Sequence, residues 1–470
     1  MKIKIISLLI VCIPFLINAQ HISPSGGGKF EYIPKDEITG EQRAEIFEYI
    51  HQNIALLKQE GRISNATAKI TASEFIFPLQ WSDGYEGYNF YGISNYVDQN
   101  TAFPGLITDY NCGTRSYDTE DGYNHQGIDY FLWPFDWNLM DAGAVKIVSA
   151  APGLIVGKYD GQPDQSCVWG GGTWNAVYVR HDDGSIAWYG HMKNGSTTAK
   201  GLGDSVALGE YLGLVGSSGN SSGPHLHFEI YDTDDNLIDP YSGACNNLND
   251  ESWWIDQPEY IAPVINKIQT HNLPPVFNPC PDLITTNESD IFMPGDEAYF
   301  AIYAKDLSPS DLNKLKITRA DGSVWYEWEF YQPDYYYVAS YWYWYYTIPL
   351  DVPEGMWKWS CELAGNYYEH EFLVGALPIA ITSEDILNNI SVQLSGNIIQ
   401  LNLTATESFD GDLIVTNLSG QNLLQKEYSF NSGTTSIEIP FENFSSGIYM
   451  MNIRDSDTGN NNSIKFIKVN

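Results

Sequence analysis

The sequence predicts a mainly β fold in which several β-rich units follow a short N-terminal helical segment. Two features of the composition favour this class: aromatic residues make up 14% of the chain, and it contains 41 Gly. The third feature is the frequency of short runs in which apolar and polar residues alternate between turn-forming residues. At roughly 150 residues per domain, a chain of 470 residues corresponds to about three domains.

The charge of the chain argues against two classes of partner. Lys and Arg number 24 while Asp and Glu number 59, so that the formal net charge is −35. Binding to nucleic acid depends on Lys and Arg that neutralise phosphates, and anionic membrane surfaces attract the same residues. We therefore expect a partner that is neither nucleic acid nor an anionic membrane.

The first 19 residues have the features of a secretory signal peptide. Lys2 and Lys4 provide the charged start, residues 5–16 are apolar, and residues 17–19 form the cleavage site. No later apolar run approaches the length needed to span a bilayer, so we expect no transmembrane anchor. The mature protein should reach an oxidising compartment, where disulfides persist. The cysteines that remain are Cys112, Cys167, Cys245, Cys280 and Cys361. Because their number is odd, at least one thiol stays outside any intramolecular disulfide.

Residues 20–74 form a segment that contains a helix. Apolar residues recur at helical spacing within residues 39–61, and Gly61 is a natural stop signal. The apolar positions are Ile46, Phe47, Ile50, Ile54 and Leu57. After this helix the pattern changes to short strands and Gly-rich turns. In this second unit, residues 177–181 and 186–188 flank an Asp183-Gly184 turn and are predicted to form a hairpin.

Three motifs in this unit carry side chains suited to catalysis. His125 and Asp129 form an HxxxD pattern, His191 lies in a Tyr-Gly-His-Met run, and His225 and His227 form an HxH pattern. On a β-strand, residues two apart face the same side, so both imidazoles of the HxH motif should face one site. The apolar residues that alternate with them should face a core.

These side chains meet the needs of a catalytic zinc ion. Such an ion takes three protein ligands from His, Asp or Glu and keeps the fourth position for water. His125, Asp129 and one His of the HxH motif supply three ligands, which predicts one zinc ion per chain. The remaining imidazole and His191 would then serve in proton transfer near neutral pH. The sequence contains no HExxH motif that would offer another metal centre: the His370-Glu371 pair is followed by Val374 where the second His would stand.

The motifs and their flanks resemble the lysostaphin-type zinc endopeptidases, the family that includes LytM and the β-lytic peptidases. The matching stretches lie between residues 120 and 240: HQGID from His125, SAAPGLIVG from Ser149, WNAVYVRHDDGSIAWYGHM from Trp174, and LGEYLGLVGSSGNSSGPHLHFEIY from Leu208. The resemblance implies a LytM-like antiparallel β-sheet peptidase domain over residues 75–262, with the metal in a groove.

The resemblance also implies a role for each polar residue of the motifs. It assigns zinc ligation to His125, Asp129 and His227, and it assigns the catalytic acid/base and oxyanion-stabilising role to His191 and His225. Met192 stands where the family usually has Leu, which is a volume-conserving change.

Other residues near the motifs have less definite roles. Some family members use a Tyr before the HxxxD motif to stabilise the oxyanion; Tyr117 and Tyr123 are both near, neither aligns with it, and the role stays open. We interpret His181, beside the Asp-Gly turn, as structural. The aromatic insert at residues 131–144 is longer than usual in the family and is expected to form a wall of the groove.

Residues 276–375 are predicted to form a β-sandwich-like domain. Within residues 325–346, fourteen of twenty-two are Trp, Tyr or Phe. We favour strands with aromatic cross-strand pairs; the alternative is a stacking platform for a polymer, which would make the protein a surface adhesin with incidental peptidase. Cys280 and Cys361 lie near the ends of this domain and could pair, although sequence does not fix the connectivity.

Residues 387–470 form the last β-rich unit, in which Ile399, Leu401 and Leu403 alternate with polar residues. The segment resembles the C-terminal sorting domain of the type IX secretion pathway. The alternation predicts a second β-sandwich-like domain, and the resemblance implies type IX secretion machinery as a partner. We therefore expect export through the periplasm, followed by secretion or retention at the cell surface.

The sequence as a whole predicts a secreted zinc metalloendopeptidase, expected to be a monomer. By resemblance its substrate is peptidoglycan cross-link peptides, and the alternative is a glycine-rich protein such as elastin. A rival hypothesis is a catalytically silent LytM-like module that binds or regulates; such modules typically lack the ligands, which are present here. Residues 20–74 are either a plain helical segment or a pro-region that shields the site until export, since related enzymes are often made latent.

Overall fold

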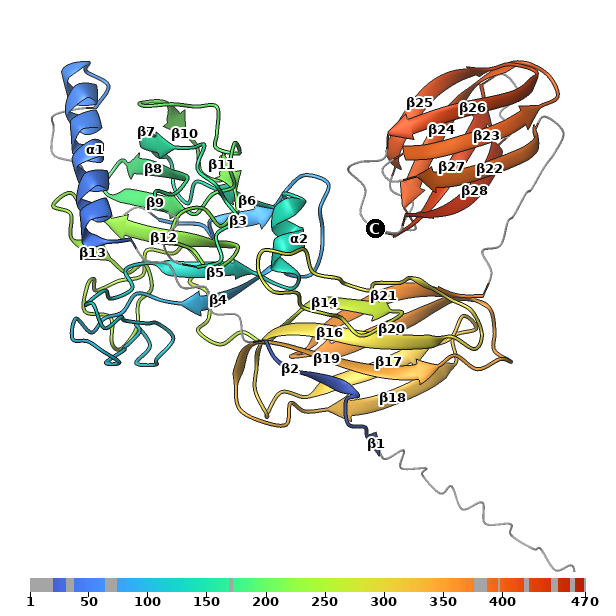
Figure 1. Cartoon of the computed structure of the whole chain (residues 1–470), viewed down its shortest axis with the longest axis horizontal. Helices are drawn as coiled ribbons and strands as arrows, with labels where there is room; N and C mark the ends of the chain where they lie inside the picture. The colour runs from blue at the N-terminus through green and yellow to red at the C-terminus, as the bar shows by residue number, and fades with distance from the viewer. Residues whose placement is uncertain are drawn as a thin grey trace, which may run out of the picture.

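The structure is a computed structural model in which the chain forms three β-rich domains and one long helix (Figure 1). It describes residues 20–30, 38–63, 74–168, 172–375, 387–395, 398–417, 422–440, 447–456 and 461–468. The predicted signal peptide, residues 1–19, lies outside these ranges. Within them, no helix combines the length and the apolar character that a membrane span requires. The mainly β class expected from the sequence is confirmed.

The first domain contains a large and a small antiparallel sheet. In spatial order, the large sheet consists of β10 (Ser205–Val206), β7 (Gly153–Tyr159), β8 (Ala176–His181), β9 (Ile186–Gly190), β12 (His225–Tyr231), β5 (Ile128–Leu132) and β4 (Tyr91–Asn95), with β13 (Leu237–Ile238) paired to β12. The small sheet consists of β11 (Tyr211–Leu214), β6 (Val145–Val148) and β3 (Leu79–Trp81). The predicted hairpin is confirmed, because β8 and β9 pair on either side of the Asp-Gly turn, where Gly184 has a φ of 93°.

The core of the first domain is built by alternation along the strands. On β12, the side chains of Leu226, Phe228 and Ile230 are buried in the main hydrophobic cluster, as predicted. The intervening residues of β12 therefore face the other side of the large sheet. That second face carries Trp188 and Tyr231, which belong to a separate cluster.

Helix α1 (Gly40–Gln59) belongs to this second cluster and lies along the large sheet (Figure 1). Thr39 caps the helix, because its hydroxyl accepts from the backbone N–H of Gln42 while the Gln42 side chain accepts from the N–H of Thr39. On its apolar face, Ile46 and Ile50 are buried and the ring of Phe47 lies 5.0 Å from that of Trp188. The helix predicted within residues 39–61 is confirmed.

The middle domain is a sandwich of two sheets that includes two short strands from the segment before helix α1. One sheet has the order β1 (Gln20–His21), β18 (Val324–Phe330), β17 (Asn313–Thr318), β20 (Gly355–Leu363), β21 (Asn366–Val374) and β15 (Ile291–Phe292). The other has the order β14 (Val264–His271), β16 (Glu297–Leu307), β19 (Tyr337–Thr347) and β2 (Gly26–Lys29). The sandwich thus includes β14, which precedes the start of this domain predicted at residue 276. That boundary was predicted from the loop after β14, which is rich in Pro and Asn. The described residues of the segment 20–74 therefore contribute to both domains.

The aromatic stretch at residues 325–346 forms strands of this sandwich, as favoured from the sequence. Trp328 on β18 and Trp344 on β19 are fully buried, and their rings lie 5.4 Å apart between the two sheets. Trp357 and Trp359 on β20 complete the same cluster. Within residues 325–346, burial accounts for Trp328, Phe330, Trp342 and Trp344, while Tyr326, Tyr331, Tyr335 and Tyr345 are exposed.

The first and middle domains are joined by a packed interface, and here two expectations were wrong. Trp133 and Phe135 of the aromatic insert, which includes α2 (Asp136–Asp141), are buried against Phe277 and Tyr303 of the middle domain. The insert therefore supplies interdomain core and not the predicted wall of a groove. Arg115 and Asp306 form a buried ion pair of 3.2 Å across the same interface.

The second wrong expectation concerns the pairing of Cys280 with Cys361. Cys280 is bonded to Cys167 in a loop of the first domain, and Cys112 is bonded to Cys245. Cys361 is a free thiol, fully buried in the sandwich core. The two cysteines do not meet because Cys361 faces inward from β20, while Cys280 lies in the loop that contacts the first domain.

The C-terminal domain is a second sandwich, as expected from the alternation (Figure 1). Its sheets are β22 (Leu387–Ser395), β23 (Ile398–Ala405) and β26 (Gly433–Pro440), and β25 (Asn422–Phe430), β24 (Phe409–Asn417), β27 (Gly447–Asp455) and β28 (Asn461–Lys468). Ile399, Leu401 and Leu403 are buried in its core.

Candidate metal centre

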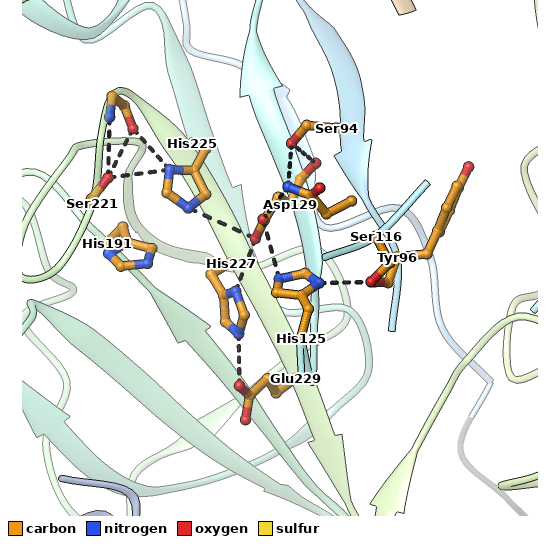
Figure 2. A network of polar contacts seen from close by, with 12 residues as sticks. Ser94, Tyr96, Ser116, His125, Asp129, His191, Ser221, His225, His227 and Glu229 are labelled. Atoms are coloured by element: carbon orange, nitrogen blue, oxygen red, sulfur yellow. Dashed lines mark hydrogen bonds and ion pairs between the residues drawn. The ribbon is translucent and has the colours of Figure 1, made fainter. Parts of the chain in front are cut away.

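Antiparallel pairing brings the three motifs together in the large sheet. Strand β12 lies between β5 and β9, and His227 is directly opposite Asp129 on one side and Gly190 on the other. His191 follows Gly190 at the end of β9. Residues 98 positions apart in the sequence therefore become neighbours, and their side chains point toward one another (Figure 2).

The carboxylate of Asp129 is the centre of this cluster. Its Oδ2 lies 3.1 Å from Nε2 of His125, and its Oδ1 lies 2.9 Å from Nδ1 of His227. Nε2 of His225 lies 3.7 Å from the same Oδ1. All four side chains are fully buried. The structure thus brings together the HxxxD and HxH motifs, which the sequence analysis combined in one predicted zinc site.

In each imidazole of the site, one ring nitrogen lies within hydrogen-bond distance of an oxygen atom that can only accept a hydrogen bond. Nδ1 of His125 lies 2.8 Å from the carbonyl oxygen of Tyr96, and Nδ1 of His225 lies 2.8 Å from that of Gly223. Nδ1 of His191 lies 2.6 Å from the carbonyl oxygen of Ser218. These nitrogens must carry the proton, so in the neutral imidazole the other nitrogen, Nε2, is an acceptor.

His227 is oriented the opposite way, by a carboxylate. Its Nε2 lies 2.7 Å from Oε1 of Glu229, two residues further along the same face of β12. Glu229 is fully buried beside Arg43 of helix α1, whose Nη1 lies 2.5 Å from its Oε2. Burial by itself would raise the pKa of Glu229, but Arg43 and His227 hold that pKa well below its ordinary value. Nε2 of His227 therefore donates to an ionised carboxylate, and Nδ1 of the neutral ring faces Asp129 as an acceptor.

These donors fit a zinc ion. His125, Asp129 and His227 offer one ligand atom each, and these atoms lie within 4.8 Å of one another. With the protons fixed as described, Nε2 of His125 and Nδ1 of His227 both turn lone pairs toward an anionic carboxylate, an arrangement that a cation between them stabilises. Two imidazoles and one carboxylate are a ligand set of catalytic zinc sites.

His191 and His225 lie side by side next to these ligands, with ring centroids 4.4 Å apart. His191 has a φ of 58°, a left-handed conformation that is uncommon outside glycine and that recurs at functional sites. A cavity of about 130 Å³ opens beside its ring. Trp174 and, from helix α1, Gln42 and Glu45 are among the residues that line it.

The structure also places the residues whose roles were less definite. The ring of Tyr117 stacks on that of His125, with centroids 4.8 Å apart, and Tyr123 packs next to Tyr117. His181 lies away from the cluster, where it is buried with Nδ1 2.9 Å from the carbonyl oxygen of Pro152. This contact agrees with the structural interpretation of His181.

Several contributors to the site were not anticipated from the sequence, among them Asn95, the carbonyl of Tyr96, Glu229 and Arg43. Asn95 donates through Nδ2 to Oδ2 of Asp129 at 2.8 Å. Glu229 was detectable, because it follows His227 by two residues and must share its face of the strand. Nothing in the sequence pairs Arg43 or β4 with this site, since both lie far from the motifs along the chain.

Comparison with known proteins agrees with this geometry. Residues 124–240 match the model of peptidase family M23, and residues 395–469 match that of the secretion system C-terminal sorting domain. The chain therefore contains a LytM-like M23 peptidase domain, and its C-terminal domain is a type IX sorting domain. These two matches assign residues 124–240 and 395–469 to families.

The similar curated proteins share only part of their length with this chain. It is 46% identical over 59 residues to the DD-carboxypeptidase/endopeptidase Mpg of Neisseria meningitidis, a match that spans 13% of either protein. It is 31% identical over 127 residues to the cell division protein DipM of Caulobacter vibrioides, covering 25% of this chain and 20% of that protein. Among solved structures, the catalytic domain of the M23 protein EnpA from Enterococcus faecalis is 30% identical, with 33% of this chain and 92% of that chain covered and a TM-score of 0.21.

Proposed function

We propose that this protein is a zinc-dependent endopeptidase that hydrolyses peptide cross-links of peptidoglycan outside the cytoplasm. The observation that carries the proposal is the buried carboxylate of Asp129 between Nε2 of His125 and Nδ1 of His227, at 3.1 and 2.9 Å. In support, a matching relative is described as a DD-carboxypeptidase/endopeptidase and another as a cell division protein.

In this proposal His125, Asp129 and His227 hold one zinc ion. Bound there, zinc would polarise the scissile carbonyl and lower the pKa of a water molecule toward neutrality. The chain's own contribution is to present these ligands with their protons already placed on the far nitrogens. Burial of all three side chains keeps bulk water from competing for them.

His191 and His225 act as the proton-transfer pair. Their Nδ1 atoms donate to the carbonyl oxygens of Ser218 and Gly223, so that each Nε2 can accept a proton from the attacking water. The same nitrogen then returns the proton to the leaving amine, or donates to the oxyanion as it forms. The peptide enters by the cavity beside His191, part of whose wall belongs to helix α1.

The two ends of the chain give the proposed location. The signal peptide of residues 1–19 would direct passage into the periplasm. The sorting domain would then engage the type IX secretion machinery, which would leave the peptidase secreted or at the cell surface.

The experiment compares the mature protein with His227→Ala and Asp129→Ala variants. We expect the unaltered protein to contain about one zinc per chain and to release peptides from purified peptidoglycan in a chelator-sensitive reaction, identified by mass analysis. Both variants should lose zinc and hydrolysis. The matched control is His51→Ala, since His51 is an exposed histidine of helix α1.

Two outcomes would contradict the proposal. Hydrolysis and zinc content that survive in the His227→Ala variant would show that the ligands are assigned wrongly. Zinc binding without hydrolysis of peptidoglycan would favour the alternatives, which are a glycine-rich protein as substrate or a silent binding module. Incubation with elastin separates those two.

A further inference from the structure

A continuous chain of polar side chains connects helix α1 to a proposed zinc ligand. Nε2 of His227 donates to Oε1 of Glu229 at 2.7 Å. The guanidinium of Arg43 reaches both oxygens of the same carboxylate, with Nη1 2.5 Å from Oε2 and Nη2 3.0 Å from Oε1. Tyr231 completes the shell of Glu229 by donating to Oε2 at 2.5 Å.

The geometry of this chain leaves Glu229 little freedom. The Glu229 side chain has no exposed surface, and that of Arg43 is 12% exposed. Two parallel N–H···O bonds fix the plane of a carboxylate as well as its position. Arg43 is itself held by the packing of α1, since the neighbouring Phe47 contacts both Trp188 and Tyr231.

We propose that Arg43 is a positioning residue for the metal centre: by fixing Glu229, it sets the ring orientation of His227 and the nitrogen that His227 turns to the metal. A carboxylate on the far nitrogen of a ligating imidazole fixes its tautomer and raises its basicity, and its loss typically lowers metal affinity about 10-fold to 100-fold. The inference rests on the proposed function. It assigns a role at the site to a residue outside the range that matches the peptidase family.

One consequence concerns residues 20–74, for which a pro-region was one of two interpretations. Removal of helix α1 would take the guanidinium away from the buried carboxylate of Glu229 and would uncover the apolar face of the large sheet at Trp188. An ionised carboxylate left in an apolar environment without its partner is strongly unfavourable. Helix α1 is therefore a permanent part of the active peptidase, and truncation should lower activity where a pro-region would raise it.

The test measures zinc affinity by equilibrium competition with a chromogenic chelator. We expect Arg43→Gln to weaken zinc binding about 10-fold to 100-fold and Arg43→Lys to weaken it less, since Lys keeps the charge and loses the bidentate geometry. The matched control is Arg62→Gln, an arginine just beyond α1 that contacts residues 202–204 and not the site; its zinc affinity should equal that of the unaltered protein.

A double-variant cycle separates positioning from a general loss of stability. In a Glu229→Gln background the link is already broken, so adding Arg43→Gln should change zinc affinity less than threefold. The absorption spectrum of the cobalt-substituted protein should shift in both single variants. Urea unfolding of the metal-free proteins tests whether each variant is folded. If Arg43→Gln does not fold, Arg43→Lys replaces it in the zinc-affinity measurements.

Two results would overturn the inference while leaving the proposed function intact. One is zinc affinity of Arg43→Gln within threefold of the unaltered protein. The other is an effect of Arg43→Gln that is equally large in the Glu229→Gln background. An unaltered protein that binds no zinc would instead overturn the proposed function and this inference together.

Discussion

Replacing Gly127 with Ala should displace the imidazole of His227 and weaken metal binding. Gly127 lies between His125 and Asp129 in the HxxxD motif. A Cβ at this position would lie 2.5 Å from both Cε1 and Nε2 of His227 and 3.0 Å from the carbonyl oxygen of Phe228. The carbonyl is backbone of β12, which is paired on both sides in the sheet, so the imidazole is the group that must move.

The size of the effect follows from these distances. Nonbonded carbon atoms are at their optimum at about 3.5–4.0 Å, so the ring must shift by about 1 Å. Such a shift cannot preserve both of its contacts, 2.9 Å to Asp129 and 2.7 Å to Glu229. Loss of one contact should reduce zinc affinity about 10-fold to 100-fold, or about 1.4–2.7 kcal/mol. A misplacement of this size should also reduce kcat/KM on a peptide substrate about 100-fold.

The assay is the chelator competition described above, together with kcat/KM at saturating zinc. Gly201→Ala is the matched control, because it makes the same change in the same domain where a Cβ would have no neighbour within 4 Å. The reasoning is refuted if Gly127→Ala binds zinc as tightly as Gly201→Ala. Full activity of Gly127→Ala with unchanged zinc affinity would show that the His227 imidazole accommodates the added methyl group without leaving its position.

Three further predictions concern the middle domain and its interface. Burial lowers the pKa of His271 to about 4, against about 6.5 in the unfolded chain. The free energy of unfolding should therefore fall by up to about 3 kcal/mol as the pH falls from about 6.5 to 4, and His271→Gln should remove this pH dependence from urea unfolding curves. Replacing Cys167 and Cys280 together with Ser opens a link between residues 113 apart and should lower the free energy of unfolding by about 2–5 kcal/mol. Asp306→Ala leaves the guanidinium of Arg115 buried without its carboxylate and should cost about 3–5 kcal/mol in the same measurement.

Each of these has a result that would contradict it. A pH dependence that is unchanged in His271→Gln would mean that another group titrates. For the disulfide, equal unfolding midpoints with and without Cys167 and Cys280 would show that the interface needs no covalent link. An Asp306→Ala variant as stable as the exposed control Glu362→Ala would show that solvent reaches Arg115.

The parts of the fold that could be predicted are those specified by local patterns. The helical spacing from Ile46 to Leu57 and the alternation on β12 each determine one buried face, and both were recovered. The contribution of β2 to the middle domain could not be predicted. Its sequence is Gly-Gly-Gly-Lys, which has no apolar side chain to signal a strand, and its partner β19 lies about 300 residues away.

The same division applies to the site. His125, Asp129, His191, His225 and His227 lie in compact motifs, so their types and spacing were sufficient to nominate them. The disulfides were not accessible in this way, because the pairing of Cys280 with Cys167 depends on how two domains pack. Glu229 was overlooked although its spacing from His227 places both side chains on one face of β12, because that spacing alone does not show that the carboxylate contacts the imidazole.

The range that matches the peptidase family contains all five polar residues of the site but not all of the groups that orient them. The amide of Asn95, the last residue of β4, fixes Asp129, and the carbonyl of Tyr96, the next residue, fixes His125; both residues precede residue 124. Arg43 comes from helix α1 and fixes Glu229. Ligand position is the property on which a metal site depends most steeply, because errors of about 1 Å already cost orders of magnitude. In the proposed function the catalytic unit is therefore larger than its motifs, because strand β4 and helix α1 supply groups that orient proposed metal ligands lying elsewhere in the sequence.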